Sequence, residues 1–524
     1  MFILLFASAD AGFPAGFIPQ ERRRAPWKDD LMGNSRPNIV IVMTDQQRAG
    51  LCRREGFALD TTPFLDQLAA GGAWFNRAYT TMPACAPARV SMLTGRYPSA
   101  TRVRTNHNIA DAFYSRDMFE LFREAGYATG LCGKNHSHLS SQRADFWCEF
   151  GHLGGPADTD GERAFDAFLE RTHFHMHPEA TPFPLECQLP HRIVSRAAQW
   201  LDTVRDRPFL VWLSFPEPHN PYQVPEPYYS MFPPEALPPT AAGAEAVAAK
   251  GLPYEWCRDS FEAAFPDFAP TLPRARANYM GMLRLIDDQL NRFAGYLERR
   301  GLRENTLLVF LSDHGDFAGE YGLMRKGPEM PEALIRIPLI FNGPGIPAHR
   351  AALPSHVSIA DLLPTLCEAA GIAVPDGVQG RSFWRVLTGE EDPEARFGSA
   401  FAEQGFGGLP YDGSEELDAG QDGFEPSPDG EQWGAFDCLN SRTQSGCMRM
   451  VRKGDWKLVR DAAGRAWLHH LGDDPAEVRN LHCVPEHRAV EEELTEQMLG
   501  WLLRLEDPLP HPRTRYVVKR PGAK

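Results

Sequence analysis

Four short apolar runs, each followed by polar or charged residues, constrain the fold of this chain most strongly. They are Ile39–Met43 before Asp45, Pro208–Phe215 before His219, Thr306–Leu311 before Asp313, and Ile337–Phe341 before Asn342. Runs of this length without polar alternation are typical of strands buried on both faces. Helical periodicity lies between them, most clearly from Tyr279 to Leu297. We therefore expect an α/β fold with a doubly wound, mostly parallel sheet flanked by helices.

The rest of the chain divides into segments of different composition. We predict a leader at 1–34, a catalytic α/β domain at 35–400 with an irregular insertion at 234–273, an acidic loop at 401–434, a C-terminal subdomain at 435–510 and a tail at 511–524. In the C-terminal subdomain, three turn-separated runs at 448–452, 456–460 and 467–471 predict an antiparallel sheet. Leucine periodicity over 486–505 predicts a closing helix.

Composition argues against several classes of partner. The chain has 54 basic and 69 acidic residues, a net charge of −15, whereas binding a phosphate backbone requires a basic surface. No apolar run is long enough to span a bilayer. The run Phe2–Phe6 with Ala-Ser-Ala9 resembles a signal peptide, but it is short and no basic residue precedes it. We expect a cytoplasmic protein, with a periplasmic or secreted one as the alternative.

Ten cysteines are scattered singly along the chain, with no Cys-x-x-Cys pair. This spacing argues against a zinc ribbon and favours mostly buried free thiols. The two that lie closest in sequence, Cys438 and Cys447, could still form a disulfide.

The polar ends of the strands predict a shared site. In doubly wound sheets the ligand lies beyond the carboxyl ends of the strands, where Asp45, His219, Asp313 and His314 are all found. Asp45-Gln46 and Asp313-His314 could together hold a hard divalent cation, which prefers oxygen ligands supplied by separate loops.

Two further segments carry candidate cations and proton carriers. In Gly133-Lys134-Asn135-His136, an extended backbone would place Lys134 and His136 on one face. Lysine could there hold an anionic oxygen, while histidine could move a proton near neutral pH. Lys326 lies shortly after the Asp-His pair, and His219 lies in a proline-rich loop.

The segment Cys85-Ala-Pro-Ala-Arg89, followed by Val-Ser-Met-Leu-Thr94-Gly95, is the most specific motif. Residues 88–93 can open a helix, whose N-terminus favours an anion, and Arg89 would face the same spot one turn on. Together with the order of the other pieces, this motif resembles the signature of the type I sulfatase family, within the alkaline phosphatase-like superfamily. The resemblance runs from about Arg36 to about Leu505.

The resemblance implies an enzyme, a hydrolase of sulfuric esters of the arylsulfatase type, acting on a sulfated carbohydrate or an aryl sulfate. It implies that a formylglycine-generating enzyme converts Cys85 to formylglycine, whose hydrate attacks sulfur and later expels sulfate. Its metal, usually Ca²⁺ with Mn²⁺ or Mg²⁺ as alternatives, would be bound by Asp45, Gln46, Asp313 and His314. Arg89 would hold the hydrate, Lys134 and Lys326 would clamp the sulfate, and His136 and His219 would act as acid–base partners.

Three alternatives stay open. The first is a phosphonate monoester or phosphodiester hydrolase, which is the runner-up. Gln46 stands where many family members have a second aspartate, and the Asp-Gln and Asp-His variants also occur in phosphonate monoester hydrolases. Asn135 replaces an aromatic residue common at that place in the family. A non-catalytic binder of sulfated glycans would have lost the nucleophile or the ligands, which are all present. A thiol hydrolase would use Cys85 as a thiolate with His136 or His219 as its base.

Overall fold

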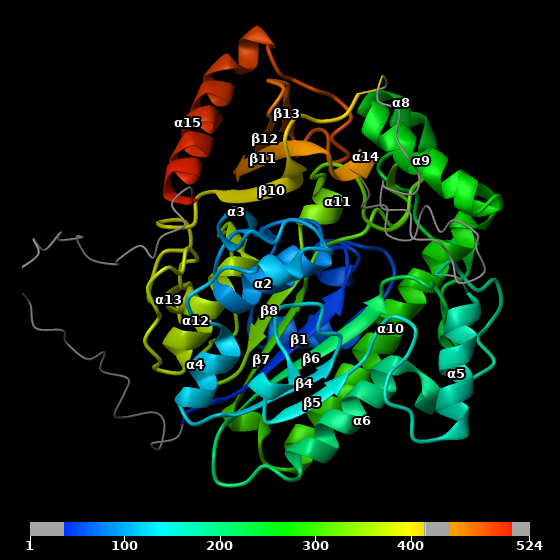
Figure 1. The fold of residues 1–524 in the computed structure, drawn as a ribbon, viewed down its shortest axis with the longest axis vertical. Coiled ribbons are helices and arrows are strands. Elements are labelled where there is room, and N and C mark those ends of the chain that lie inside the picture. The colour runs from blue at the N-terminus through cyan, green and yellow to red at the C-terminus, as the bar shows by residue number, and fades with distance from the viewer. Residues whose placement is uncertain (1–35, 173, 413, 415–440, 506–524) are drawn as a thin grey trace, which may run out of the picture. The chain divides into compact units, whose positions relative to one another are not determined.

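A seven-stranded mixed sheet lies at the centre of the fold (Figure 1). The computed structural model describes residues 36–172, 174–412, 414 and 441–505. The strand order is β2-β8-β7-β1-β6-β4-β5. The bounds are β1 Asn38–Asp45, β2 Ala73–Phe75, β4 Ala128–Gly133, β5 Phe146–Glu149, β6 Phe209–Pro218, β7 Thr306–Ser312 and β8 Leu339–Asn342. The strands from β7 to β5 in this order are parallel to one another.

Both faces of the sheet are covered, as the unbroken apolar runs predict. Along the central strand β1, Ile39, Ile41 and Met43 join one core, while Val40 and Val42 join the other, because successive side chains of a strand point to opposite faces. The first core is closed by α2 Cys85–Thr94, α4 Met118–Glu124, α12 Leu362–Ala369 and α13 Trp384–Leu387. The second is closed by α1 Pro63–Ala70, α5 Asp160–Arg171, α6 Leu189–Leu201 and α10 Phe268–Arg299. The doubly wound α/β architecture is confirmed.

One edge of the sheet departs from the expected parallel order. β8 is antiparallel to β7, and β2 is antiparallel to β8. A parallel return requires a crossover across a face of the sheet, usually by a helix. Between β7 and β8 the chain forms only a 3-10 turn and the short α11, Glu332–Ile335, so it comes back beside β7 in the opposite direction.

The 234–273 stretch is mostly helical, which corrects the prediction of an irregular insertion. It contains α8 Val247–Lys250, α9 Leu252–Ala264 and the start of α10. Pro253 lies in the first turn of α9, where a missing N–H costs no hydrogen bond. Tyr254, Cys257 and Phe261 of α9 are buried in a core shared with α10. Pro253 therefore marks the start of a helix rather than an irregular stretch.

A four-stranded antiparallel sheet forms the C-terminal part of the fold, in the order β10-β11-β12-β13 (Figure 1). Its elements are β10 Ala400–Gly407, β11 Gly446–Lys453, β12 Trp456–Asp461, β13 Ala466–His470 and the helix α15 Arg488–Leu505. Leu494, Met498 and Trp501 of α15 pack against Phe401 and Leu458 of the sheet. β10 occupies the beginning of the stretch predicted as an acidic loop, whose residues 415–440 lie outside the described residues.

The remaining α-helices and strands are short. They are α3 Pro98–Thr101, α7 Tyr228–Met231, α14 Ser441–Gln444 and a parallel pair of strands, β3 Ala78–Tyr79 and β9 Val357–Ser358. Within the described part of the chain, no helix is both long and apolar enough to cross a bilayer. Nine described cysteines are unpaired in disulfides, and seven of them are buried. Cys438 lies outside the described residues, so the Cys438–Cys447 pairing is not decided.

Candidate active site

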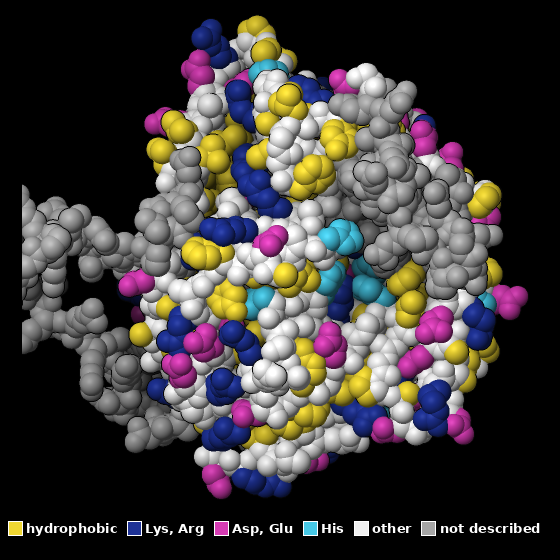
Figure 2. Space-filling view, viewed as in Figure 1, with side chains coloured by type: hydrophobic (Ala, Val, Ile, Leu, Met, Phe, Trp, Pro, Cys, Tyr) yellow, Lys and Arg dark blue, Asp and Glu magenta, His cyan; other side chains and the backbone are white. Residues whose placement is uncertain are grey.

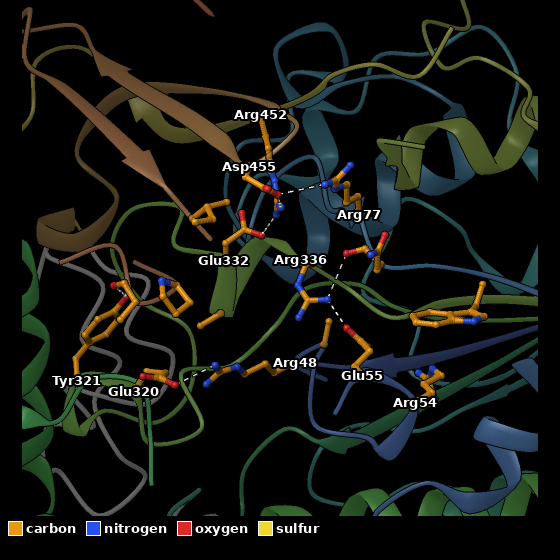
Figure 3. A pocket seen from close by; sticks show the side chains of 17 residues that line it. Arg48, Arg54, Glu55, Arg77, Glu320, Tyr321, Glu332, Arg336, Arg452 and Asp455 are labelled. Atoms are coloured by element: carbon orange, nitrogen blue, oxygen red, sulfur yellow. Dashed lines mark hydrogen bonds and ion pairs between the residues drawn. The ribbon is translucent and has the colours of Figure 1, made fainter. Parts of the chain in front are cut away.

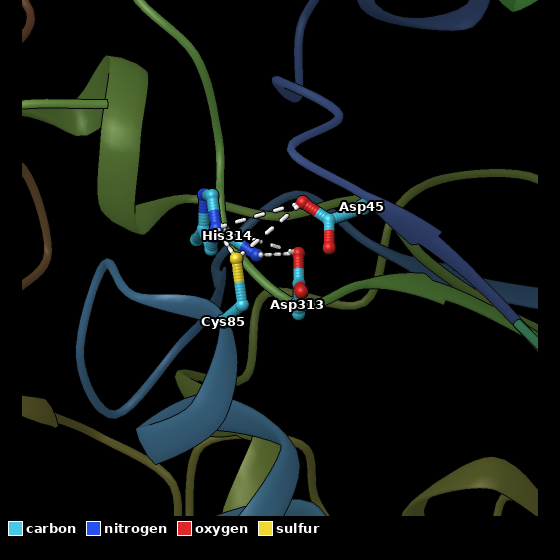
Figure 4. Close-up of side chains that lie close together, drawn as sticks. All are labelled: Asp45, Cys85, Asp313 and His314. Atoms are coloured by element: carbon cyan, nitrogen blue, oxygen red, sulfur yellow. Dashed lines mark hydrogen bonds and ion pairs between the residues drawn. The ribbon is translucent and has the colours of Figure 1, made fainter. Parts of the chain in front are cut away.

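Four potential metal ligands converge at the carboxyl end of the parallel strands. Asp45 is the last residue of β1, and Asp313 and His314 directly follow the neighbouring strand β7. One ligand atom from each of Asp45, Cys85, Asp313 and His314 lies within 4.8 Å of the others (Figure 4). All four residues are buried. Strand ends therefore bring Asp45, Asp313 and His314 together, and Cys85 reaches them from the start of α2.

The helix α2 begins at Cys85 and points the cysteine at this cluster. Ala84 before it is extended, with φ −149° and ψ 139°, and Gly95 after it ends the helix with φ 65°. The Cys85 thiol lies 3.6 Å from Asp45 Oδ1 and 3.2 Å from His314 Nε2. Only 1% of Cys85 is exposed. Because the free N–H groups and the dipole of a helix N-terminus attract negative charge, this position favours an anion.

Arg89, one turn further along α2, ties the two aspartates together. Its Nη2 donates to Asp45 Oδ2 at 3.0 Å and its Nε to Asp313 Oδ2 at 2.9 Å. Its Nη1 donates to Ser214 Oγ at 2.7 Å and to the Lys134 carbonyl at 2.9 Å. The guanidinium is fully buried and each of its nitrogens has an acceptor. Arg89 therefore fixes the carboxylates beneath Cys85.

Lys134 enters the site because β4 ends at a glycine. Gly133 has φ 115°, and a Cβ there would lie 1.8 Å from the Ser214 carbonyl oxygen, so only glycine allows β4 to approach β6 so closely. The Lys134 ammonium then contacts Asp45 and donates to His152 Nε2 at 2.7 Å. His136 has φ 45° and is half-buried. The backbone turns here, so the predicted extended face shared by Lys134 and His136 is wrong.

A second lysine closes the opposite side of the site. The Lys326 ammonium donates to Gln46 Oε1 at 3.1 Å and to His219 Nε2 at 3.0 Å. The Gln46 amide nitrogen donates to Asp316 Oδ2 at 2.7 Å. His219 directly follows β6. Its imidazole stacks on that of His152, with ring centroids 3.8 Å apart. The two lysines are thus connected through two stacked histidine rings.

Charge pairing sets the protonation of these groups. Burial alone would raise the pKa of Asp45, but Lys134 and Arg89 hold it well below its usual range. Burial, His152 and Lys326 lower the pKa of His219, and burial and Lys134 lower that of His152. Both imidazoles are therefore neutral at pH 7 and accept hydrogen bonds from the lysines.

The donor set fits a hard divalent cation. Two carboxylates, a ring nitrogen and the nearby Gln46 amide oxygen offer mainly oxygen ligands. His314 Nε2 lies 3.9 Å from Asp45 Oδ1 and 3.7 Å from Asp313 Oδ1. Burial alone lowers the pKa of His314, but Asp313 and Cys85 outweigh it and raise the pKa to about 9. Asp313 and Cys85 thus favour positive charge at Nε2, which a bound cation could supply in place of a proton.

Three residues that contact the predicted site residues were not predicted from the sequence. His152 follows the edge strand β5, Ser214 lies within β6, and Asp316 lies three residues after Asp313. His152 stands at a strand end like the predicted residues, and recognising β5 as a strand would have found it. Ser214 carries no such signal. Histidines gather with Lys or Arg side chains near the middle of the face in Figure 2.

A separate charged cavity of about 480 Å³ lies between the main sheet and the C-terminal sheet (Figure 3). Arg48 pairs there with Glu320, Arg336 with Glu55, and Arg452 with Glu332. Arg54 also lines it and pairs with Asp66 through one oxygen, at 2.6 Å. None of the predicted site residues lines this cavity, so it offers matched control positions.

Comparisons with known proteins agree with this geometry. Residues 37–372 match the family model described as Sulfatase. An arylsulfatase from Clostridium perfringens is 30% identical over 390 residues, covering 66% of this chain and 77% of that protein. The fold is similar to a phosphonate monoester hydrolase of Agrobacterium radiobacter (TM-score 0.69, 23% identity, 90% of this chain and 96% of that one). It is also similar to BT1596, a 2-O GAG sulfatase (TM-score 0.68, 20% identity, 90% and 93%).

Proposed function

Because the chain belongs to the sulfatase family, within the alkaline phosphatase-like superfamily, and is a hydrolase of sulfuric esters, we propose that it cleaves a sulfate monoester at Cys85. The substrate is a sulfated carbohydrate or an aryl sulfate. One observation carries the proposal: the Cys85 side chain starts a helix and contacts both Asp45 and His314 in a buried cluster of metal ligands. No other cysteine of the described chain has such surroundings.

The reactive group is formylglycine, made from Cys85 by a formylglycine-generating enzyme. Its hydrate supplies a hydroxyl nucleophile and a second hydroxyl that can release sulfate, an exit that a serine or cysteine ester lacks. The position of Cys85 supports this reading, because it begins α2 and lies 3.6 Å from Asp45 Oδ1 and 3.2 Å from His314 Nε2.

Lys134 and Lys326 hold the anionic sulfate oxygens in this proposal. Both ammonium groups are buried, and they stand on opposite sides of the stacked His152–His219 pair. Buried, pre-positioned cations stabilise charge that spreads over a transferring group more strongly than cations in water. The neutral histidines that accept from them keep each ammonium oriented without neutralising it.

Proton transfer falls to His219 and His136 in this proposal. His219 Nδ1 donates to the Asn220 carbonyl at 2.8 Å, which leaves Nε2, the atom that contacts Lys326, facing the site. Lys326 can give a proton to the leaving alcohol and regain one through this imidazole. His136, two residues after Lys134, is the base for the release of sulfate.

Arg89 acts as a positioning residue for Asp45 and Asp313. The resemblance assigned it to the aldehyde hydrate, yet its nitrogens already donate to both aspartates, Ser214 and the Lys134 carbonyl. A rigid, planar guanidinium is suited to holding two carboxylates at a fixed separation. It therefore sets the spacing of the ligands on which the nucleophile depends.

Asp45, Gln46, Asp313 and His314 hold one divalent cation, with Ca²⁺ as the first choice and Mn²⁺ or Mg²⁺ as alternatives. When bound, the cation neutralises the carboxylates and stabilises negative charge on the sulfate oxygens. Gln46 brings an amide oxygen in place of a carboxylate, so the protein contributes one negative charge fewer than a set with three aspartates.

The second candidate is a phosphonate monoester or phosphodiester hydrolase. Gln46 and His314 favour it, because the Asp-Gln and Asp-His pairs also occur in phosphonate monoester hydrolases. The two functions are separated by turnover of an aryl sulfate and an aryl phosphonate ester under identical conditions. A higher kcat/KM for the sulfate supports the sulfatase proposal, and a much higher value for the phosphonate overturns it.

Mass spectrometry of the peptide that contains Cys85 tests the nucleophile. Conversion lowers the peptide mass by the difference between a thiol and an aldehyde side chain. Activity that scales with the converted fraction supports formylglycine. An unmodified protein with full activity supports the thiol hydrolase instead, and a converted protein without activity on any ester overturns the sulfatase proposal.

A further inference from the structure

A second group of nucleophilic and titratable side chains lies in the C-terminal subdomain. The Cys483 sulfur is 3.2 Å from Nε2 of its neighbour His482. The opposite nitrogen of that ring, Nδ1, is 2.8 Å from Glu491 Oε1 at the start of α15. A thiol, an imidazole and a carboxylate therefore stand in line, which is the arrangement of a nucleophile, a base and a group that orients the base.

The carboxylate fixes the tautomer of the imidazole. Glu491 Oε1 also accepts from Arg460 Nη2 at 3.1 Å, and Glu491 Oε2 accepts from the backbone N–H of Cys483 at 3.2 Å. An oxygen of a carboxylate accepts from the ring nitrogen that it faces. Nδ1 of His482 therefore carries the proton, and Nε2 is the atom left to accept one from the thiol of Cys483.

Cys483 differs from the other described cysteines in its exposure. Seven are buried and Cys447 is half-buried, whereas Cys483 is exposed. Its backbone has φ 62°, a conformation that is uncommon for a residue with a side chain. The side chain lines an open cavity of about 710 Å³ whose other walls include Val484, Arg488 and Leu499. A small molecule can reach this sulfur without any unfolding.

We propose that Cys483 is a modification site, a nucleophilic thiol that forms mixed disulfides with small disulfides. His482 takes the thiol proton, and the Cys483 sulfur attacks one sulfur of the small disulfide. The S–S bond of that disulfide breaks, and its second sulfur leaves as a thiolate that recovers the proton from His482. The small disulfide is the oxidant, and one small thiol is released for each protein modified. This site is independent of the sulfatase proposal.

The test measures the reaction of the folded protein with dithiobis(nitrobenzoate) at pH 7. The starting protein carries Cys438→Ser and Cys447→Ser, which removes the thiol outside the described residues and the half-buried one. We expect one fast thiol, assigned to Cys483 by peptide mapping and absent in Cys483→Ser. His482→Gln should slow it by at least about tenfold, because a general base contributes at least this much, and Glu491→Gln should slow it less.

His487→Gln is the matched control, since this nearby histidine packs against Trp456, whereas the hydrogen bonds of Cys483 go to His482 and Glu491. This substitution should change the reaction rate of Cys483 by less than about twofold, because it does not remove the proposed general base. Hydrolysis of an aryl sulfate should be unchanged in every variant, which shows that each is folded. The proposal is overturned if Cys483 reacts no faster in the folded than in the denatured protein, or if His482→Gln leaves its rate unchanged.

Discussion

The imidazole rings of His152 and His219 stack at 3.8 Å, and each accepts a hydrogen bond from a different buried lysine. The pair therefore joins Lys134 to Lys326 across the site. Replacing His152 by Phe keeps a flat ring for His219 but removes the acceptor of Lys134. We expect kcat/KM for an aryl sulfate to fall by about tenfold, the value of one lost hydrogen bond to a charged group.

The loss should appear mainly in kcat, because an unanchored Lys134 still carries its charge but no longer a fixed position. His138→Phe is the control, since this histidine packs on Tyr114 and contacts Asp117 rather than the lysines. An equal loss in both variants would show that the effect comes from the fold of the segment and not from the stacked pair.

Arg89→Lys tests the proposed positioning role. Lysine keeps the charge but cannot donate to Asp45 and Asp313 in the same planar arrangement. We expect kcat/KM to fall by about a hundredfold and the affinity for the divalent cation, measured by calorimetry on chelator-treated protein, to fall with it. Arg54→Lys, at a one-oxygen ion pair in the other charged cavity, should change both quantities by less than about threefold. Retention of cation affinity in Arg89→Lys would contradict the role.

Gln46→Glu probes the charge of the ligand set. The added carboxylate should strengthen Ca²⁺ binding, but it also meets Asp316, which now accepts from the Gln46 amide at 2.7 Å. Without cation, we expect unfolding to become easier by about 1–3 kcal/mol, because a buried hydrogen bond is replaced by a repulsive contact. Adding Asp316→Asn should recover most of this loss. Two additive losses, measured by thermal unfolding with chelator, would exclude the coupling.

Glu217 should make stability depend on pH. Burial raises its pKa to about 8 from 4.5, so the folded state keeps a proton that the unfolded chain releases near pH 4.5. The folded state then binds more protons between pH 4.5 and 8, and the free energy of unfolding falls as pH rises through this window and levels off above it. Glu217→Gln removes the dependence and should gain a few kcal/mol relative to the parent between pH 5 and pH 9.

The exposed Glu226 provides the control for this prediction. Glu226→Gln should leave the pH dependence of the melting temperature as it is in the parent protein. If Glu217→Gln and the parent protein melt with parallel pH profiles, the buried carboxyl is ionised in the folded state and the prediction is wrong.

Strand ends made most of the site predictable from sequence. Asp45, His219 and the Asp313–His314 pair follow long apolar runs, and parallel strands bring such residues to one edge of a sheet. His152 was missed because β5 is a short edge strand in which only Cys148 is buried, so it shows no apolar run. The geometry of Lys134 and His136 depends on left-handed backbone at 133 and 136, which an assumed extended strand could not supply.

The C-terminal boundary was harder to predict for a related reason. β10 begins at Ala400, and its residues Glu403, Gln404 and Gly405 break the apolar pattern by which strands are recognised. The buried side chain of Glu403 accepts a hydrogen bond from the Ser99 hydroxyl and forms an ion pair with Arg449. The partners of this buried carboxylate are distant in sequence. No local sequence pattern predicts such partners.

The near-complete burial of Cys85 determines whether the residue can be modified before or after the chain folds. A modifying enzyme must surround the residue it oxidises, yet here the cysteine is enclosed by β1, the 313–314 turn and its own helix. In the proposed function, conversion of Cys85 to formylglycine would therefore take place on a nascent or unfolded chain, before the sheet closes over it. A molecule that folds before modification would keep the Cys85 thiol, because the buried side chain is out of the enzyme's reach. The converted fraction of a preparation would therefore measure the rate of modification relative to the rate of folding.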